Sequence, residues 1–443
     1  MNRFLMGLGT GIIVGAAALT IYWAAPKIFI GNLAGGILTS GMQPAKEKTS
    51  AELLAEALKK SQTVKGLYMT ADVANDQGVA GTRLRKKIIE LADETEINGL
   101  VIDVKEVCGP DYNAESLKKL IAELHQKKIW VIARIVAFKD ASQIETHPDW
   151  YLTRKSPKAV GDECGRKKYL RAKSPEGKKP DVVFWRDKRG GYWLDPAHQG
   201  AREYIADFSK KIIDLGFDEL QFDYLRFPSD GDVENAIYPA WDGKAPKYSV
   251  MKSFFEYLNK NLKAHKPDII LSADLFGYAA IRAGDVGIGQ RLDDIGDNFD
   301  YVSFMVYPSH YYSGLYLQAD PDKNLPVVNF SVSQARKNPD VVVYRSLQFA
   351  RDFLDGKIST STFNGFSPAT SAITLAASST PRSRARLRPW LEDFFHEEDR
   401  VAGRPWGVEK IRKQVEAAEK AEPHGWLLWN AANIYTEGAL NHN

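Results

Sequence analysis

The feature that most constrains the fold is a regular alternation of short apolar segments with longer amphipathic ones between residues 66 and 430. Because near-continuous apolar strands joined by helices form parallel sheets covered by helices, eight such units predict an α/β fold, a (β/α)8 TIM-type barrel. The eight predicted strands are Gly66–Ala71, Gly99–Lys105, Ile129–Val136, a segment around Asp223, Ile269–Leu275, Tyr301–Tyr307, part of Leu387–Phe395, and Gly425–Asn430.

The segments between these strands have apolar residues at helical spacing, as at Leu117, Leu120, Ile121 and Leu124. The predicted helices are Thr82–Glu96, Glu115–Lys127, Gly200–Leu215, Val250–His265, Val341–Leu354 and Val408–Ala421. Residues 26–60 read as a linker followed by a short helix, Ser50–Lys60, with Ser50 as its N-cap. We therefore place the barrel domain at residues 61–443.

The N-terminus carries an uncharged run, Phe4–Ala25, that as a helix would be about 33 Å long, enough to cross a bilayer core. Arg3 precedes the run, which favours a cytoplasmic N-terminus and export of the rest. We predict a signal anchor within residues 1–25, a single-pass cell-membrane protein and an extracytoplasmic barrel. A cleaved signal peptide is the alternative, because Ala24–Ala25 could precede cleavage.

Charge and motifs narrow the classes of partner. A net charge of +3, with no P-loop and no zinc-finger spacing, argues against nucleic acid, and no motif calls for a cofactor. Cys108 and Cys164 lack metal-ligand spacing, and on the residues alone a disulfide and two free thiols are equally consistent with them.

A basic segment, Arg154–Arg189, has thirteen Lys or Arg against five Asp or Glu. Such a run is usually a solvated loop. Here it follows the third predicted strand, so in a barrel it would lie on the catalytic face, and an anionic polysaccharide becomes an alternative substrate.

Polar residues at the carboxyl ends of the predicted strands converge on one face of a barrel. Asp103, Asp223 and Asp274 end the second, fourth and fifth strands, and Lys105 could neutralise Asp103 from the same strand face. The other candidate substrate-binding residues are Tyr224, Arg226, Tyr307, His310, Glu392, Trp429 and Asn430. Carboxyl groups ringed by aromatic side chains suit glycoside hydrolysis.

The alternative for each aspartate is a buried ion pair with Lys105, Arg134 or Arg226. His310 has no second histidine at metal-binding spacing, so we predict no metal site.

Six segments of the chain form a recognisable set: residues 193–231, WLDPAHQGAREYIADFSKKIIDLGFDELQFDYLRFPSDG, and the shorter VIDVKE, ARIVAFKD, SFMVYPSHY, RPWLEDFF and GWLLWNAANIYT. In these segments the chain resembles a bacterial family of glycosyl hydrolase-like (β/α)8 barrels, which is distantly similar to alpha-amylase-type enzymes. The resemblance implies that Asp223 is the nucleophile or base and Asp274 the proton donor. Asp274 stands where glutamate is usual, and Gln221 where an arginine is usual. The resemblance also implies that Cys108 and Cys164 lie on loops at the same face of the barrel, which favours a disulfide between them.

The sequence thus predicts a glycosidase that cleaves an extracytoplasmic polysaccharide by carboxylate chemistry. The alternatives are a non-catalytic glycan-binding or scaffolding barrel, and a lyase or esterase acting on carbohydrate.

Overall fold

The structure is a computed structural model that describes residues 48–156, 158–165, 183–282, 284–360, 373–375, 383, 385–397, 401, 407–422 and 424–443. These residues belong to one compact unit that begins at Lys48. The predicted membrane anchor at residues 1–25 and the linker up to residue 47 lie outside the described residues, as does much of the basic segment. Within the described ranges, no helix is both long and apolar enough to cross a membrane.

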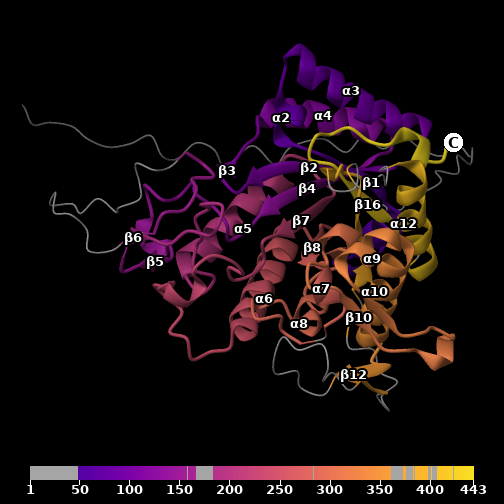
Figure 1. Cartoon of the computed structure of the whole chain (residues 1–443). Helices are drawn as coiled ribbons and strands as arrows, with labels where there is room; N and C mark the ends of the chain where they lie inside the picture. The colour runs from indigo at the N-terminus through magenta and orange to yellow at the C-terminus, as the bar shows by residue number, and fades with distance from the viewer. Residues whose placement is uncertain are drawn as a thin grey trace, which may run out of the picture. The chain divides into compact units, whose positions relative to one another are not determined.

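Eight parallel strands close into a barrel, which confirms the predicted fold (Figure 1). Each strand pairs with the next one along the chain, and β1 pairs with both β2 and β16, which closes the ring. The strands are β1 (Lys65–Met69), β2 (Gly99–Glu106), β4 (Trp130–Val136), β7 (Glu219–Asp223), β8 (Ile270–Phe276), β9 (Tyr301–Met305), the split strand β14 (Arg386–Leu387) and β15 (Trp390–Glu392), and β16 (Trp426–Trp429).

Most of the helices lie within a few residues of their predicted positions. They are α3 (Val79–Glu94), α4 (Ala114–Gln126), α5 (Gln199–Ile213), α6 (Lys247–His265), α10 (Pro339–Leu354) and α12 (Val408–Ala421). Between β8 and β9 two short helices, α7 (Gly277–Ala280) and α8 (Leu292–Gly296), stand in place of one long helix. The remaining short elements are α2 (Ala71–Asn75), β3 (Gly109–Pro110), β5 (Thr153–Arg154), β6 (Val183–Phe184), β10 (Leu315–Leu317), β11 (Val328–Phe330), α9 (Val332–Lys337), β12 (Ile358–Thr360) and β13 (Ile373–Leu375).

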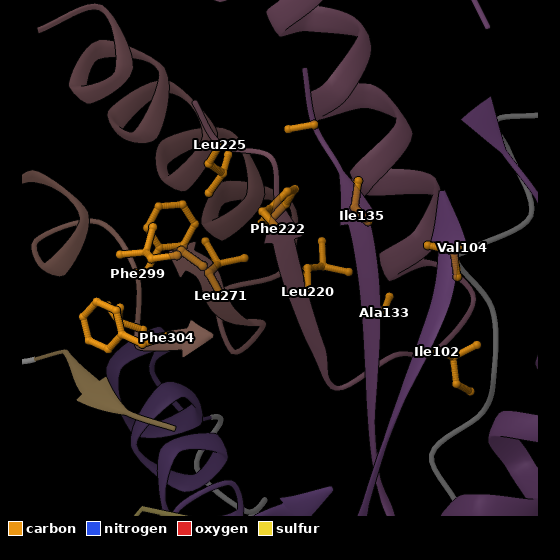
Figure 2. Close-up of a cluster of buried hydrophobic side chains, with 14 of the residues drawn as sticks. Ile102, Val104, Ala133, Ile135, Leu220, Phe222, Leu225, Leu271, Phe299 and Phe304 are labelled. Atoms are coloured by element: carbon orange, nitrogen blue, oxygen red, sulfur yellow. The ribbon is translucent and has the colours of Figure 1, made fainter. Parts of the chain in front are cut away.

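The main hydrophobic core lies on the outer face of the barrel strands, where the side chains meet the helices. Alternate residues of each strand point outward, because successive side chains of a strand lie on opposite faces. Figure 2 shows part of this core, with labelled residues Ile102, Val104, Ala133, Ile135, Leu220, Phe222, Leu225, Leu271, Phe299 and Phe304, all in one buried cluster. The other face of each strand supplies the side chains inside the barrel.

The first described helix, α1 (Ser50–Lys60), lies against the amino-terminal ends of the strands. Its N-cap is Thr49, one residue before the predicted Ser50, because Thr49 and Glu52 form a reciprocal capping box. Ala57 packs against Ile270 and Tyr301 at the bottom of the barrel. The helix is therefore part of the barrel's floor.

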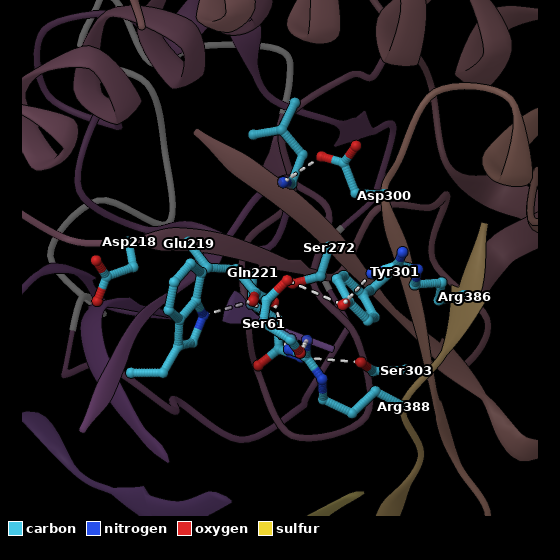
Figure 3. A network of polar contacts seen from close by, with 12 residues as sticks. Ser61, Asp218, Glu219, Gln221, Ser272, Asp300, Tyr301, Ser303, Arg386 and Arg388 are labelled. Atoms are coloured by element: carbon cyan, nitrogen blue, oxygen red, sulfur yellow. Dashed lines mark hydrogen bonds and ion pairs between the residues drawn. The ribbon is translucent and has the colours of Figure 1, made fainter. Parts of the chain in front are cut away.

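A buried ion pair fills the inside of the barrel above α1 (Figure 3). The Arg388 guanidinium donates from Nη1 to both carboxylate oxygens of Glu219, at 3.0 and 2.9 Å, and neither residue is exposed. Glu219 also accepts from Trp130 Nε1 at 3.0 Å, and Arg388 Nη2 donates to the Ser61 carbonyl oxygen at 2.9 Å. The network ties strands far apart in the sequence to the segment that follows α1.

We expect Arg388→Met to lower the free energy of unfolding by about 3 kcal/mol at pH 7, because it leaves the Glu219 carboxylate buried without its cation. The double variant Glu219→Leu/Arg388→Met removes both charges and is expected to recover most of that loss. Urea unfolding of both variants measures the free energy lost in the single variant and recovered in the double variant. A double variant as unstable as the single one would contradict the charge argument.

Candidate active site

The centre of the carboxyl end of the barrel is the guanidinium of Arg134, from β4, which is 5% exposed. Its Nη1 donates to Asp103 Oδ1 at 2.8 Å and to Glu106 Oε1 at 2.6 Å, and its Nη2 donates to Asp223 Oδ2 at 2.6 Å. Its Nε lies 3.9 Å from Asp274 Oδ2. All three predicted aspartates therefore surround a single cation.

Asp103 is enclosed within this cluster. Its second oxygen accepts a hydrogen bond from the Tyr68 hydroxyl, and Tyr68 in turn stacks on Trp429 with ring centroids 3.8 Å apart. Burial raises the pKa of Asp103, and the nearby Glu106 charge adds to this, while Arg134 opposes it. These contacts give Asp103 a role in holding Arg134 and the Tyr68 ring.

Asp223 is the most open of the three aspartates, with 12% of its side chain exposed. Its Oδ1 accepts from the Tyr224 backbone N–H at 2.6 Å. Tyr224 has a φ of 53°, a left-handed conformation that is uncommon for a residue with a large side chain. Strained residues of this kind cluster at functional sites, and here the turn follows directly on the predicted nucleophile.

Asp274 is buried, and its Oδ1 accepts a hydrogen bond from Trp390 Nε1 at 2.8 Å. Burial, together with the nearby Asp223 charge, raises the pKa of Asp274 well above its usual range. Burial also raises the pKa of Tyr307, and the charges of Asp274 and Asp223 raise it further. The Tyr307 side chain therefore lies near both carboxyl groups. A carboxyl whose pKa is raised is better suited to act as a proton donor.

The prediction that Lys105 neutralises Asp103 is wrong. The register of β2 against β4 shifts between these two residues, so that Asp103 lies opposite Arg134 and Lys105 opposite Ile135. This bulge breaks the two-residue alternation on which the prediction depended. Lys105 is fully buried and pairs with Asp140 at 2.8 Å, and within the described residues it forms no ion pair with Asp103.

Three further candidates hold the site's surroundings in place. Glu392 is buried and accepts from the Ser309 hydroxyl at 2.5 Å. The Asn430 amide donates to two backbone carbonyls, those of Asp393 and Ile434, so its N–H groups are occupied. Trp429 lies inside the barrel, 5.0 Å from the Arg134 guanidinium.

A cleft of about 460 Å³ opens at this end of the barrel, and none of the three predicted aspartates is among its lining residues. Its wall includes three of the predicted residues, Tyr224, Arg226 and His310. Sequence reasoning did not identify the others, which include Lys139, Asp187, Trp193, Phe276, Tyr278 and Tyr312. Two of the lining residues are close in the chain to the aspartates, because Tyr224 follows Asp223 directly and Phe276 follows Asp274 by two residues.

Cys108 and Cys164 form a disulfide, 56 residues apart in the chain, as the family resemblance implied. The bond ties the loop after β2 to the segment after β5. Glu163, next to Cys164, pairs with Lys139 of the cleft wall at 2.6 Å, and Asp187 binds the same ammonium at 3.0 Å. Lys139 is therefore neutralised by two carboxylates.

Metal binding finds no support in the part of the chain that the structure describes, where no group of three His, Cys, Asp or Glu side chains is placed to hold an ion. Arg134 occupies the centre of the acidic cluster instead.

Several solved structures are similar to this chain. A hypothetical protein from Ruminiclostridium thermocellum is 26% identical over 47% of this chain and 96% of its own, with a TM-score of 0.34. A maltogenic alpha-amylase from Thermotoga neapolitana is 16% identical over 56% of this chain and 50% of its own, with a TM-score of 0.32, so the chain spans about half of that enzyme. An alpha-amylase from Geobacillus thermoleovorans, complexed with acarbose, is 12% identical over 85% of this chain and 72% of its own, with a TM-score of 0.42. These scores are too low to support any further conclusion, and no curated protein matches the chain.

The sequence pattern of one protein family, described as "Putative glycosyl hydrolase domain", matches residues 66–435. That range runs from the first barrel strand to a few residues past the last one, and it contains every candidate residue named above. The resemblance noted in the sequence is thereby confirmed, and the chain belongs to this family of glycoside hydrolases.

Proposed function

We propose that the protein hydrolyses glycosidic bonds of an extracytoplasmic polysaccharide, with Asp223 as nucleophile or base and Asp274 as proton donor. The observation that carries the proposal is the contrast between these two carboxyl groups. Asp223 is partly exposed and ion-paired with Arg134, whereas burial raises the pKa of Asp274. Two neighbouring carboxyls in such different environments are the arrangement that glycoside hydrolysis requires.

In this mechanism Asp274 donates its proton to the leaving oxygen while Asp223 attacks the anomeric carbon or activates water. Arg134 orients the Asp223 carboxylate through the 2.6 Å hydrogen bond from its Nη2. At the strained turn, the Tyr224 backbone N–H donates to Asp223 Oδ1 at 2.6 Å, which fixes the orientation of that carboxylate. Each role follows from the contacts of the side chain concerned.

The location outside the cytoplasm is part of the proposal. The Cys108–Cys164 disulfide supports it, because such bonds persist mainly in oxidising compartments. The apolar run at residues 4–25 also supports it, as a membrane anchor or an export signal.

The test is release of reducing ends by the full-length protein from a panel of neutral and anionic polysaccharides. A variant with asparagine at both Asp223 and Asp274 serves as the matched control for contaminating activity. We expect release by the wild type and none by the control.

The competing function is a glycan-binding barrel without turnover. It is favoured by the way Arg134 engages the carboxylates of both Asp103 and Asp223. Binding of a polysaccharide by wild type and control alike, with no reducing ends released by either, would establish that function in place of hydrolysis.

A further inference from the structure

One buried cation in the cleft, Arg226, has neither a carboxylate partner nor a full set of hydrogen-bond acceptors among the described residues. Arg226 is 7% exposed, and its guanidinium carbon lies 4.6 Å from the ring centroid of Phe276, 4.9 Å from that of Trp193 and 5.0 Å from that of Tyr224. Among the described residues, no carboxylate lies within 4.0 Å of it. Arg226 is therefore held by aromatic faces, without a counter-ion.

Its hydrogen bonds leave one edge of the guanidinium unused. Nη1 donates to the Phe227 carbonyl oxygen at 3.0 Å and to Ser229 Oγ at 3.2 Å. Nε and Nη2 have no acceptor in the described part of the chain. Arg202, equally buried and also without a carboxylate, uses Nε, Nη1 and Nη2 on three protein oxygens.

The acidic residues near Arg226 act on it only from a distance: burial lowers the pKa of Arg226, and Asp223, Asp230 and Asp187 oppose that shift, but none of the three forms an ion pair with it. Asp187 is committed to Lys139 and to the Trp193 indole N–H, at 3.0 Å each. Asp230 is an exposed residue of the cleft's wall. A buried cation without a counter-ion is costly, so the cleft favours a ligand that brings a negative charge.

We propose that Arg226 binds the carboxylate of a uronic acid residue in the polysaccharide, through Nε and Nη2. These two N–H groups lie on one edge of the planar guanidinium and match the two oxygens of a carboxylate. The cleft volume of about 460 Å³ is in the range of small-ligand sites, and its aromatic side chains suit the faces of sugar rings. The inference rests on the proposed glycosidase function and names its substrate class.

The test measures binding, so that it does not depend on turnover. Isothermal titration calorimetry compares oligosaccharides of alginate, polygalacturonate and hyaluronan with their carboxyl-reduced counterparts, using the full-length protein. We expect at least one acidic oligosaccharide to bind tenfold or more tightly than its reduced form, and Arg226→Gln to remove that difference. Arg83→Gln is the matched control, because Arg83 is an exposed arginine of α3 that does not line the cleft, and we expect less than a twofold change.

Arg226→Lys keeps the charge without the two-donor edge, and an intermediate loss of affinity is expected. It also replaces Arg226→Gln if that variant does not fold. Equal binding of acidic and reduced forms, no binding of any acidic form, or full affinity in Arg226→Gln would overturn the proposal. Tighter binding of dextran sulfate oligosaccharides than of any uronate would overturn the assignment to a carboxylate.

The two proposals fail in different ways. Uronate binding through Arg226 without release of reducing ends would refute hydrolysis and leave the anion subsite standing. Release of reducing ends that Arg226→Gln does not alter would refute the subsite and leave hydrolysis standing.

Discussion

Asp223→Asn and Asp274→Asn are each expected to lower kcat/KM on the polysaccharide substrate by at least about a thousandfold. The first variant removes the partly exposed carboxylate that we propose as nucleophile or base, and the second removes the proposed proton donor. Both are close in shape to the native residue, so circular dichroism and thermal unfolding should resemble those of the wild type. Activity retained in both variants would refute the assignment of the site.

The two roles can be separated with an aryl glycoside whose leaving group needs no proton. On that substrate Asp274→Asn should lose far less activity than on the polysaccharide, whereas Asp223→Asn should lose activity on both. Equal losses on both substrates in Asp274→Asn would exclude it as the donor.

The pH dependence provides a further check on Asp274. Because the donor must be protonated and burial raises the pKa of Asp274, kcat/KM of the wild type should fall as the pH rises through that pKa. This fall at high pH should be missing in Asp274→Asn.

Arg134→Met is expected to abolish hydrolysis and to lower the free energy of unfolding at pH 7 by about 5 kcal/mol. The variant leaves Asp103, Glu106, Asp223 and Asp274 close together without the cation that they share. Arg134→Lys keeps one charge but loses the several contacts that the guanidinium makes, so a smaller loss is expected.

The loss of stability in Arg134→Met should be larger at higher pH. Burial already raises the pKa of Asp103 and Asp274 while Arg134 lowers it, so removing Arg134 raises it further. The folded variant then binds more protons than the unfolded chain, and its stability falls as the pH rises above the unfolded pKa of about 4. Urea unfolding should show that the free energy of unfolding of Arg134→Met differs less from that of the wild type at pH 5 than at pH 7.5. A gap independent of pH would contradict this account.

The fold could be predicted because its signals are local. An apolar run such as residues 129–136 is recognisable in isolation, and so is the helical spacing that begins at Leu117. The positions of Asp223 and Asp274 followed from the rule that polar residues at the carboxyl ends of barrel strands converge.

The centre of the site was harder to predict because it depends on packing between strands. Arg134 shares one strand face with Trp130 and Ile132, a spacing that points it into the barrel, but the sequence does not show that it binds several carboxylates at once. The bulge between Asp103 and Lys105 cannot be recognised from the pattern of apolar and polar residues in the sequence. The pairing of Arg388 with Glu219 joins residues 169 positions apart, a separation that no local pattern covers.

The way β1 closes the ring also determines when the protein can fold. Lys65 pairs with Trp426, so one edge of β1 has no partner until the chain has been synthesised through Trp426. Unpaired strand edges are templates for aggregation, and contacts this distant form slowly. A nascent chain cut short before Trp426 would leave β1 and β15 as open edges, so we expect such fragments to aggregate and the intact protein to depend on protection during its synthesis or export.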